Sequence, residues 1–401
     1  MIRKRRVLFF SEAVTLAHVA RPMVLAKSLE YAGHEPVMAC HDRYKRFLLN
    51  QTWQVLPLGS ISSEQFLHQL ALGKPVYSAE TLRSYVKEDI KLIDRVKPDL
   101  IVGDFRLSLS VSARIVGIPY AAITNAYWSP FCRHKSYPLP VLPLTRYFPL
   151  PVAQFIFDVF KRKAFALHCK PLNQVRKEYG LTPIEPDLRW LYTDADFSLY
   201  ADCPKMFPME SMPDRHHFLG PVLWSPPVTD PVWWNQLPAS RPIVYLTLGS
   251  SGSPNVMQLV VDALASLPVT VMASTAGAPL PGIAPPNLFT ADYLPGCEAA
   301  ARSNLVICNG GSPTSQQALA CGVPVLGIPS NMDQFMNMAA VICSGAGEII
   351  RADRVRKHSV QDAVTRLISE PERRHQAKQL AKSFSDFDCG KLFCHFVDKV
   401  C

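Results

Sequence analysis

The sequence lacks any apolar run of about 18 uncharged residues, so no membrane-spanning helix is expected. Its basic N-terminus leads into only four apolar residues, Val7 to Phe10, so no signal peptide is predicted and the expected location is the cytoplasm. The eleven cysteines are odd in number and irregularly spaced, which argues against a disulfide framework and favours buried, reduced thiols. Charged residues make up only 19% of a chain that is 48% hydrophobic, so extensive disorder is also excluded.

The length and the hydrophobic pattern together indicate two domains. A chain of 401 residues is too long for one ordinary core and suits two domains of about 200 residues each. Short apolar runs alternate with helix-like stretches, which is typical of strands buried in parallel sheets. The predicted strands are 7–10, 36–39, 100–102, 120–124, 197–199, 243–248, 269–273, 305–308, 325–328 and 348–350. The predicted class is α/β, with two Rossmann-like, doubly wound parallel-sheet domains facing each other across a ligand-binding cleft.

A proline-rich segment separates the two halves. Six prolines lie between Gly220 and Pro242, which excludes a regular element and favours a stiff linker. We therefore predict a first domain over 1–220, a linker over 221–242 and a second domain over 243–401. The last helix of the chain is expected to pack back on the first domain.

The net charge of +9 is carried by the first half of the chain. Residues 1–210 hold 28 Lys or Arg against 19 Asp or Glu, whereas residues 211–401 hold 14 of each. This asymmetry favours an anionic partner such as an acidic acceptor or a membrane surface, the alternative being a solvated surface without a role. The sequence contains no nucleic-acid-binding motif, so nucleic acid is not expected.

A second proline-rich stretch, 138–160, is apolar and is followed by Lys161, Arg162 and Lys163. It predicts either a loop that packs on the core or forms an acceptor pocket, or a segment that touches lipid.

The segment from Leu305 to Asn337 suggests a phosphate-binding turn. Asn309, Gly310 and Gly311 follow a predicted strand and lead into a helix, with Ser312 as its N-cap. The N–H groups and the dipole at such a helix N-terminus bind a phosphate or diphosphate, and Thr314 adds a hydroxyl. The alternative is that the two glycines merely turn the chain.

An acid and an amide follow the next strand. Asp333 and Gln334 come shortly after the strand 325–328, so they are expected at the same sheet edge. Together they can accept from and donate to vicinal sugar hydroxyls.

The first half offers a candidate general base. His18 follows the strand 7–10, in a loop before a helix that is predicted to start at Pro22. Asp104 follows the strand 100–102, at the same edge of the sheet, where a carboxylate can orient an imidazole. Glu12 is a rival base or an acceptor contact.

Three residues after the strand 120–124 are predicted to line an acceptor pocket. They are Asn125, Tyr127 and Trp128. The two aromatic side chains have packing in the core as their alternative.

These residues resemble a known family. Asn309-Gly310-Gly311, Thr314, Gly322-Val323-Pro324 and Asp333-Gln334 are similar to the second-domain signature of family-one glycosyltransferases of the GT-B fold, which include UDP-glycosyltransferases and macrolide glycosyltransferases. Asp333 and Gln334 stand 24 and 25 residues after Asn309, a spacing that matches the family. The resemblance implies diphosphate contacts from the turn, including Ser312, and donor-sugar contacts from Asp333 and Gln334.

The resemblance extends to two further sites. Gly249, Ser250 and Ser251 resemble the family's phosphate-facing loop after the first strand of the donor domain. His18 and Asp104 resemble its general-base pair, although the stretch 17–22 is one residue longer than the family's.

Two departures affect the donor site. Asn309 replaces a diphosphate-contacting His, and Gln317 replaces a ribose-contacting Glu. Asn still donates a hydrogen bond but carries no positive charge, and Gln loses a charge-assisted bond.

The resemblance implies a bacterial, inverting, metal-independent enzyme without a cofactor. It would move a hexose from a nucleotide diphosphate sugar, expected to be a UDP-sugar, to a hydroxyl of a small hydrophobic or lipid-linked acceptor. The expected location is the cytoplasm, with peripheral contact at the anionic inner face of the membrane. The alternative is a non-catalytic protein that binds a nucleotide sugar or a partner through a degenerate donor site. Neither first strand is followed by Gly-x-Gly-x-x-Gly, which argues against a dinucleotide-dependent dehydrogenase.

Overall fold

The computed structural model describes residues 3–133, 136–238, 240–278, 280 and 284–401. The chain divides into two compact units. Unit 1 comprises residues 1–135, 146–222 and 387–401, and unit 2 comprises residues 136–145 and 223–386.

Unit 1 is built on a seven-stranded sheet in the order β3-β2-β1-β4-β5-β6-β7. All its pairings are parallel. The strands are β1 (Arg6–Ser11), β2 (Glu35–Cys40), β3 (Gln54–Pro57), β4 (Leu100–Asp104), β5 (Tyr120–Thr124), β6 (Phe197–Tyr200) and β7 (His216–Phe218). Five of them coincide with the predicted runs, and β3 and β7 were not predicted.

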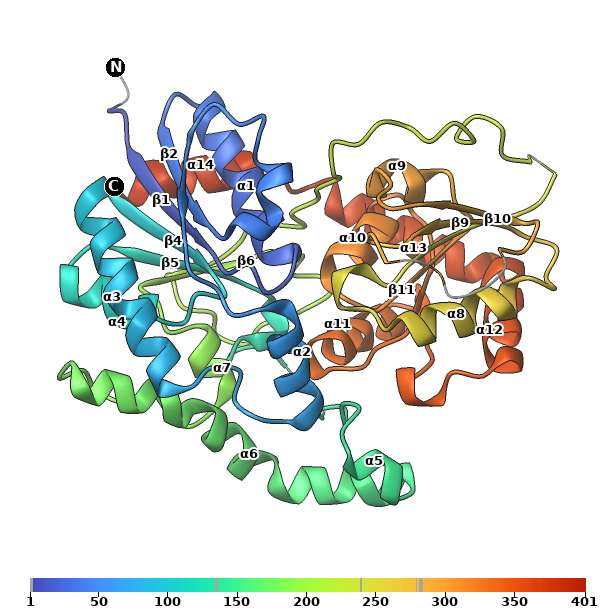
Figure 1. Cartoon of the computed structure of the whole chain (residues 1–401), viewed down its shortest axis with the longest axis horizontal. Helices are drawn as coiled ribbons and strands as arrows, with labels where there is room; N and C mark the ends of the chain where they lie inside the picture. The colour runs from blue at the N-terminus through green and yellow to red at the C-terminus, as the bar shows by residue number, and fades with distance from the viewer. Residues whose placement is uncertain (1–2, 134–135, 239, 279, 281–283) are drawn as a thin grey trace. The chain divides into compact units, whose positions relative to one another are not determined.

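Helices cover both faces of this sheet (Figure 1). Leu8 and Phe10 of β1 belong to a core that includes Leu92 and Leu109, whereas the ring of Phe9 lies 5.8 Å from that of Phe393. The helices are α1 (Ala17–Tyr31), α2 (Ser63–Leu72), α3 (Ala79–Val96), α4 (Leu109–Val116), α6 (Leu150–Glu178), α7 (Leu188–Tyr192) and α14 (Cys389–Val400). The last helix, α14, packs against α1 and so belongs to unit 1 (Figure 1).

The second proline-rich stretch is not an irregular loop throughout. A short helix, α5 (Leu144–Tyr147), precedes α6, which begins at Leu150 and runs for 29 residues. Pro151 is tolerated because it lies in the first turn, where the helix needs no backbone donor. The prediction of a loop was therefore wrong from residue 150 onward.

Unit 2 is built on a six-stranded parallel sheet in the order β10-β9-β8-β11-β12-β13. The strands are β8 (Ile243–Thr247), β9 (Thr270–Ser274), β10 (Leu288–Ala291), β11 (Leu305–Cys308), β12 (Val325–Gly327) and β13 (Gly347–Ile349). The helices are α8 (Pro254–Leu264), α9 (Gly296–Ala301), α10 (Ser312–Ala320), α11 (Met332–Cys343), α12 (Lys357–Ser369) and α13 (Pro371–Phe384). Two all-parallel, helix-covered sheets confirm the predicted fold class.

The segment 136–145 lies in unit 2, although it is far from that unit in sequence. Its Val141 N–H donates to the carbonyl of Ser330 at 2.7 Å, and Arg351 donates to the carbonyl of Leu139 at 2.6 Å. Thr145 also donates to Asp353 at 2.8 Å. Hydrogen bonds of this kind hold an otherwise irregular segment in one place.

Candidate functional site

The predicted base and its partner are in contact in unit 1. Asp104 is the last residue of β4, and its Oδ1 lies 2.7 Å from His18 Nδ1. The helix α1 begins at Ala17, so His18 is in its first turn and Pro22 is inside the helix, not at its start as predicted. Because a carboxylate only accepts, the proton of this bond belongs to Nδ1, and Nε2 is the nitrogen available to take another.

Arg21 is part of the same cluster and was missed by the sequence analysis. Its Nε donates to Asp104 Oδ2 at 2.8 Å, and its Nη2 donates to Asp104 Oδ1 at 2.7 Å. Burial lowers the pKa of Arg21, but the charge of Asp104 raises it further, so the net pKa is raised and the side chain stays cationic. The Asp104 carboxylate, which has no exposed surface, is therefore held from two sides.

The network continues behind Arg21, away from the imidazole. Arg21 Nη1 donates to Asn125 Oδ1 at 2.8 Å, and Asn125 Nδ2 donates to Asp202 at 3.1 and 3.2 Å. Asn125 is only 6% exposed. Its amide is thus bound within the protein on both sides, and the predicted place of Asn125 in an acceptor pocket stays a prediction.

Phe105 covers one face of the imidazole. The rings of His18 and Phe105 stack at a centroid distance of 4.8 Å and an interplanar angle of 16°. Phe105 has a φ of +60°, a conformation that costs free energy for a side chain of this size and that recurs at functional sites. This backbone turn directs the residue after Asp104 over the base.

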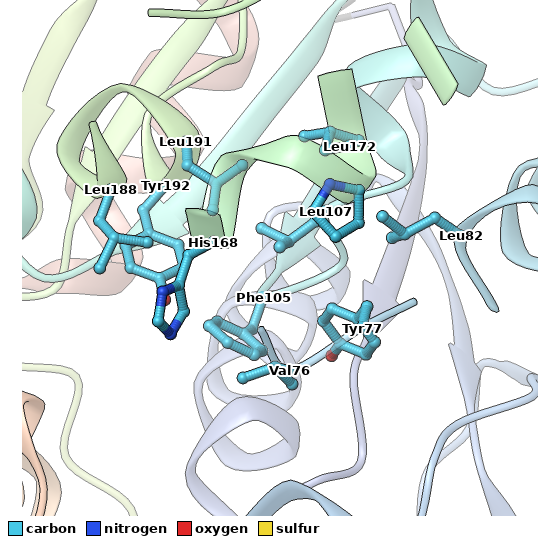
Figure 2. Close-up of a pocket in the computed structure, with 11 residues that line it drawn as sticks. Val76, Tyr77, Leu82, Phe105, Leu107, His168, Leu172, Leu188, Leu191 and Tyr192 are labelled. Atoms are coloured by element: carbon cyan, nitrogen blue, oxygen red, sulfur yellow. The ribbon is translucent and has the colours of Figure 1, made fainter. Parts of the chain in front are cut away.

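Phe105 also lines an apolar pocket (Figure 2). Figure 2 shows its lining: Val76, Tyr77, Leu82, Phe105, Leu107, His168, Pro171, Leu172, Leu188, Leu191 and Tyr192. About 20 Å³ is open to the centre of a water-sized sphere, which is room for one or two small groups. The hydroxyl of Tyr77 is buried and has no hydrogen-bond partner in the described part of the chain.

The aromatic residues predicted for the acceptor pocket lie deeper than expected. Tyr127 has no exposed surface and packs on Phe207 at 5.3 Å, so it belongs to the core. Trp128 is 8% exposed and meets the edge of Tyr192 at 4.9 Å, behind the pocket wall. Their predicted direct contact with an acceptor is therefore not supported by their positions.

Glu12 is not placed to act as a base. Its side chain has no exposed surface, and Oε2 accepts from Arg106 at 2.9 Å while Oε1 accepts from Ser60 at 2.6 Å. Arg106 is also fully buried and pairs with Asp89 at 2.9 Å. Both the rival-base prediction and the acceptor-contact prediction for Glu12 were wrong, because this carboxylate is an internal counter-ion.

The predicted donor residues meet at one edge of the sheet in unit 2. Thr247 at the end of β8 pairs with Cys308 at the end of β11, and Cys308 pairs with Gly327 at the end of β12. The 3₁₀ turn Gly249–Ser251 and the turn at 309–311 follow directly. A β-carbon placed on Gly249 would lie 3.5 Å from the side-chain Nδ2 of Asn309, so the two turns are adjacent.

The 309–311 turn leads straight into α10. Gly311 is the N-cap, so the helix begins at Ser312, one residue earlier than predicted. Gly310 has a φ of +83°, and a β-carbon there would lie 2.7 Å from Met338 Cγ. Only glycine suits this position, which lets the backbone approach a ligand at the helix N-terminus. Thr314 lies half-buried in the first helical turn.

Asn337, which the sequence analysis missed, holds this turn in place through hydrogen bonds from its side chain. Its Nδ2 donates to the carbonyl of Gly310 and to Ser315 Oγ, both at 2.8 Å. Asn337 has no exposed surface. One amide thus holds both the glycine turn and the start of α10 in a fixed position relative to α11.

Two predicted donor residues have structural partners. Gln334 is 3% exposed, and its Oε1 accepts from the Asn331 N–H at 3.4 Å in the capping box of α11 and from the Ser330 N–H at 2.8 Å. Gln317 donates to the carbonyl of Trp224 and packs against Gly296. These bonds use one end of each side-chain amide, Oε1 of Gln334 and Nε2 of Gln317, and the predicted sugar and ribose contacts of both residues stay predictions.

Asn309 and Asp333 remain at the edge of the site. Asn309 Oδ1 accepts from the Gly311 N–H at 3.0 Å, which shapes the turn. Asp333 is half-buried in the first turn of α11. The sheet edge of unit 2 therefore brings together Gly249, Ser250, Ser251, Asn309, Gly310, Gly311, Ser312, Thr314 and Asp333.

The described residues contain no group of three or more His, Cys, Asp or Glu side chains arranged to hold a metal ion. Among the same residues, no helix combines the length and the apolar character needed to cross a membrane.

Sequence comparison identifies close relatives. Residues 258–386 match the family described as erythromycin biosynthesis protein CIII-like, C-terminal domain. A PGL/p-HBAD biosynthesis glycosyltransferase of Mycobacterium tuberculosis is 49% identical over 382 residues, which cover 95% of this chain and 89% of that protein. A PGL/p-HBAD biosynthesis rhamnosyltransferase of Mycobacterium bovis has the same identity over 95% of this chain and 85% of its own. An inactive PGL/p-HBAD biosynthesis glycosyltransferase of M. bovis is 47% identical over 65% of this chain and 71% of its own.

Solved structures show the same fold at much lower identity. The spinosyn forosaminyltransferase SpnP has a TM-score of 0.72 at 19% identity, over 99% of both chains. The spinosyn rhamnosyltransferase SpnG complexed with thymidine diphosphate has a TM-score of 0.71 at 16% identity, over 98% of this chain and 100% of that one. Together with the sequence relatives, these structures confirm the predicted family: the chain belongs to the macrolide-type, family-one glycosyltransferases of the GT-B fold.

Proposed function

We propose that this glycosyltransferase inverts the anomeric centre and uses neither a metal ion nor a cofactor. The observation that carries the proposal is the 2.7 Å contact between His18 Nδ1 and Asp104 Oδ1. It leaves Nε2 to remove the proton from an acceptor hydroxyl as that oxygen attacks the anomeric carbon. The buried carboxylate holds the ring in the required tautomer and stabilises the imidazolium that forms.

The leaving group is a nucleoside diphosphate, which gains negative charge as the glycosidic bond breaks. The N-terminus of α10 and the glycine turn before it offer fixed backbone dipoles to that charge. Asn309 carries no charge of its own, so the helix terminus and the hydroxyls of Ser250 and Thr314 supply the stabilisation. We propose Asp333, half-buried at the same edge, as a contact to the donor sugar.

The sugar and the nucleotide follow from the relatives. One relative is named as a rhamnosyltransferase, which supports a deoxyhexose as the transferred sugar. A structure with this fold holds thymidine diphosphate, which supports a nucleotide diphosphate sugar as the donor without fixing the base as uridine.

The acceptor is proposed to be an alcohol or phenol on an apolar, lipid-linked body of the PGL/p-HBAD class named for the relatives. The apolar pocket supports this, because Phe105 is shared between its wall and the stack on His18. A small apolar group in the pocket would bring an attached hydroxyl toward the imidazole. The Tyr77 hydroxyl adds a donor, since burial raises its pKa well above the ordinary value and keeps it protonated.

The test is turnover of a rhamnose nucleotide with a phenol that carries an alkyl chain. We expect His18→Ala to lower kcat by 10²-fold to 10⁴-fold while donor binding is retained. The matched control is His358→Ala, at an exposed histidine of α12 in unit 2, which should leave kcat unchanged. A His18→Ala enzyme with undiminished kcat would refute the assignment of the base.

The inactive relative supports a second candidate, a non-catalytic nucleotide-sugar-binding protein. It predicts that the wild-type chain binds the donor but neither transfers nor hydrolyses the sugar with any acceptor. Wild-type turnover that His18→Ala abolishes would exclude it.

A further inference from the structure

The outer face of α6 carries an unusual concentration of exposed apolar side chains. Seven of the seventeen large hydrophobic residues that are exposed lie between residues 147 and 167 of the described chain. Phe155 is 69% exposed, Val152 44% and Val159 56%. Their spacing of three and four residues places them in one stripe along the helix. Tyr147 and Phe148 extend the stripe at its N-terminal end.

The stripe lies on a helix whose other side is packed. Phe157, Phe165 and Leu172 of α6 are buried in unit 1. Figure 1 shows α6 running along the outside of this unit, near α3 and α7. The exposed stripe is thus not the core face of the helix, and contiguous apolar surface of this kind marks an interaction site.

Cations accompany the stripe. Residues 146–170 contain five Lys or Arg and one acidic residue. Arg162, Lys163 and Lys170 are exposed, and the single acid, Asp158, is paired with Lys161 at 3.1 Å. The ammonium group of Lys163 lies 5.9 Å from the ring of Phe160, so charge and apolar surface are directly adjacent.

We propose that this surface, formed by Tyr147, Phe148, Val152, Phe155, Val159, Arg162 and Lys163, docks on an anionic lipid bilayer. Apolar side chains beside Lys and Arg are the composition of helices that lie in the membrane interface. A second copy of the chain is a poorer partner, because two such surfaces would bring like charges together. The helix also links the surface to the pocket, since His168 lines the pocket about 20 Å along α6 from Phe155.

Membrane docking by this surface does not depend on the proposed function. A role for docking in glycosyl transfer does rest on the proposed function. A lipid-linked acceptor would be met at the bilayer surface, whereas a water-soluble acceptor would give the surface no role in transfer. The binding test below therefore needs no turnover, so its failure would leave the proposed chemistry intact.

The experiment is co-sedimentation of the full chain with vesicles of phosphatidylcholine alone or with about one third phosphatidylglycerol. We expect binding to the mixed vesicles that weakens as salt is added. The triple variant Arg162→Gln, Lys163→Gln, Lys170→Gln should weaken binding on the order of a hundredfold, at roughly fivefold per charge. Phe155→Ser should weaken it about tenfold through lost apolar burial.

Matched controls separate the surface from general charge and hydrophobicity. Lys87, Lys91 and Arg95 are exposed cations on α3 of the same unit, and their triple Gln variant makes the same change in net charge. Tyr31 on α1 is 77% exposed and serves as the apolar control. Both control variants should bind like the wild type.

Three results would overturn the proposal. The first is a wild-type chain that fails to sediment with anionic vesicles. The second is control variants that lose binding as much as the α6 variants do. The third is a wild-type dimer in light scattering that Phe155→Ser converts to a monomer, which would assign the surface to a second copy. Thermal unfolding at the wild-type temperature verifies that each variant is folded.

Discussion

The bidentate ion pair between Arg21 and Asp104 leads to a prediction about both stability and catalysis. The guanidinium spans both oxygens of a carboxylate that has no exposed surface, and it also donates to Asn125. Replacing Arg21 by Lys keeps the positive charge but substitutes one compact ammonium for a planar fork with fixed directions. The three hydrogen bonds cannot all be made by one ammonium group in the same place.

The expected cost follows from these contacts. Loss of one or two charge-assisted bonds in a buried site costs about 2 kcal/mol of unfolding free energy. Arg21→Ala would instead leave Asp104 and the distant Asp202 without their buried cation and cost about 3 to 5 kcal/mol. Because a domain has a net stability of roughly 5 to 15 kcal/mol, Arg21→Lys is the variant to assay for activity and Arg21→Ala the one to test for folding.

The catalytic effect is separate from the stability effect. Arg21 Nη2 lies 3.1 Å from His18 Nδ1, so it offsets part of the field that Asp104 exerts on the imidazole. With a looser cation, the Asp104 carboxylate is fixed less firmly and therefore orients the imidazole ring less firmly. We expect kcat/KM of Arg21→Lys to fall tenfold to a hundredfold.

The control is another buried arginine of the same unit. Arg106 pairs with Glu12 and Asp89 at 2.9 Å each but makes no contact with His18 in the described structure. Arg106→Lys should cost similar unfolding free energy and leave kcat/KM unchanged. If Arg106→Lys and Arg21→Lys lower kcat/KM equally, or neither lowers it, the positioning role of Arg21 is refuted.

Two further predictions concern stability. In Gly310→Ala, the new β-carbon would lie 2.7 Å from Met338 and the alanine would be held at a φ of +83°. This variant should lose about 2 to 4 kcal/mol of unfolding free energy in a urea titration and should bind the donor more weakly. The control is Gly180→Ala, at a φ of +72° with open space around it, which should lose only about 1 kcal/mol in the same titration. Burial lowers the pKa of His216 to about 4. As the pH is lowered, the His216 imidazole takes up a proton near pH 6.5 in the unfolded chain, but only near pH 4 in the folded chain. The unfolding free energy should therefore fall by roughly 1 to 2 kcal/mol as the pH is lowered from 6.5 to 4. In His216→Phe the unfolding free energy should fall less steeply over this pH range. A variant with the same dependence of unfolding free energy on pH as the wild type would contradict the prediction.

The strands that the sequence analysis missed share one position. β3, β7 and β10 are the end strands of their sheets. Most of their residues are exposed or half-buried, so none forms the continuous apolar run that revealed the central strands. Central strands are predictable because burial on both faces constrains every residue, and that constraint is relaxed at an edge.

The same distinction separates the site residues that could be predicted from those that could not. His18 and Asp104 were found because the ends of two parallel strands must share an edge, which topology alone decides. Arg21 and Asn337 were not found, since no local pattern tells whether a side chain on a helix turns toward solvent or toward a buried carboxylate or turn.

Glu12 and Gln334 show how the fold competes with a ligand for the same side chain. Both stand at the predicted edge, and both have the chemistry of a ligand contact, yet each satisfies a polar group of the fold: Arg106 for Glu12, and the start of α11 for Gln334. A buried charge or an unpaired backbone donor costs more free energy than a solvated ligand contact gains, so internal demand is met first. Residue type at a sheet edge therefore identifies which side chains could bind a substrate. Only the number of hydrogen-bond and ion-pair partners within the protein decides which of these side chains are left to do so.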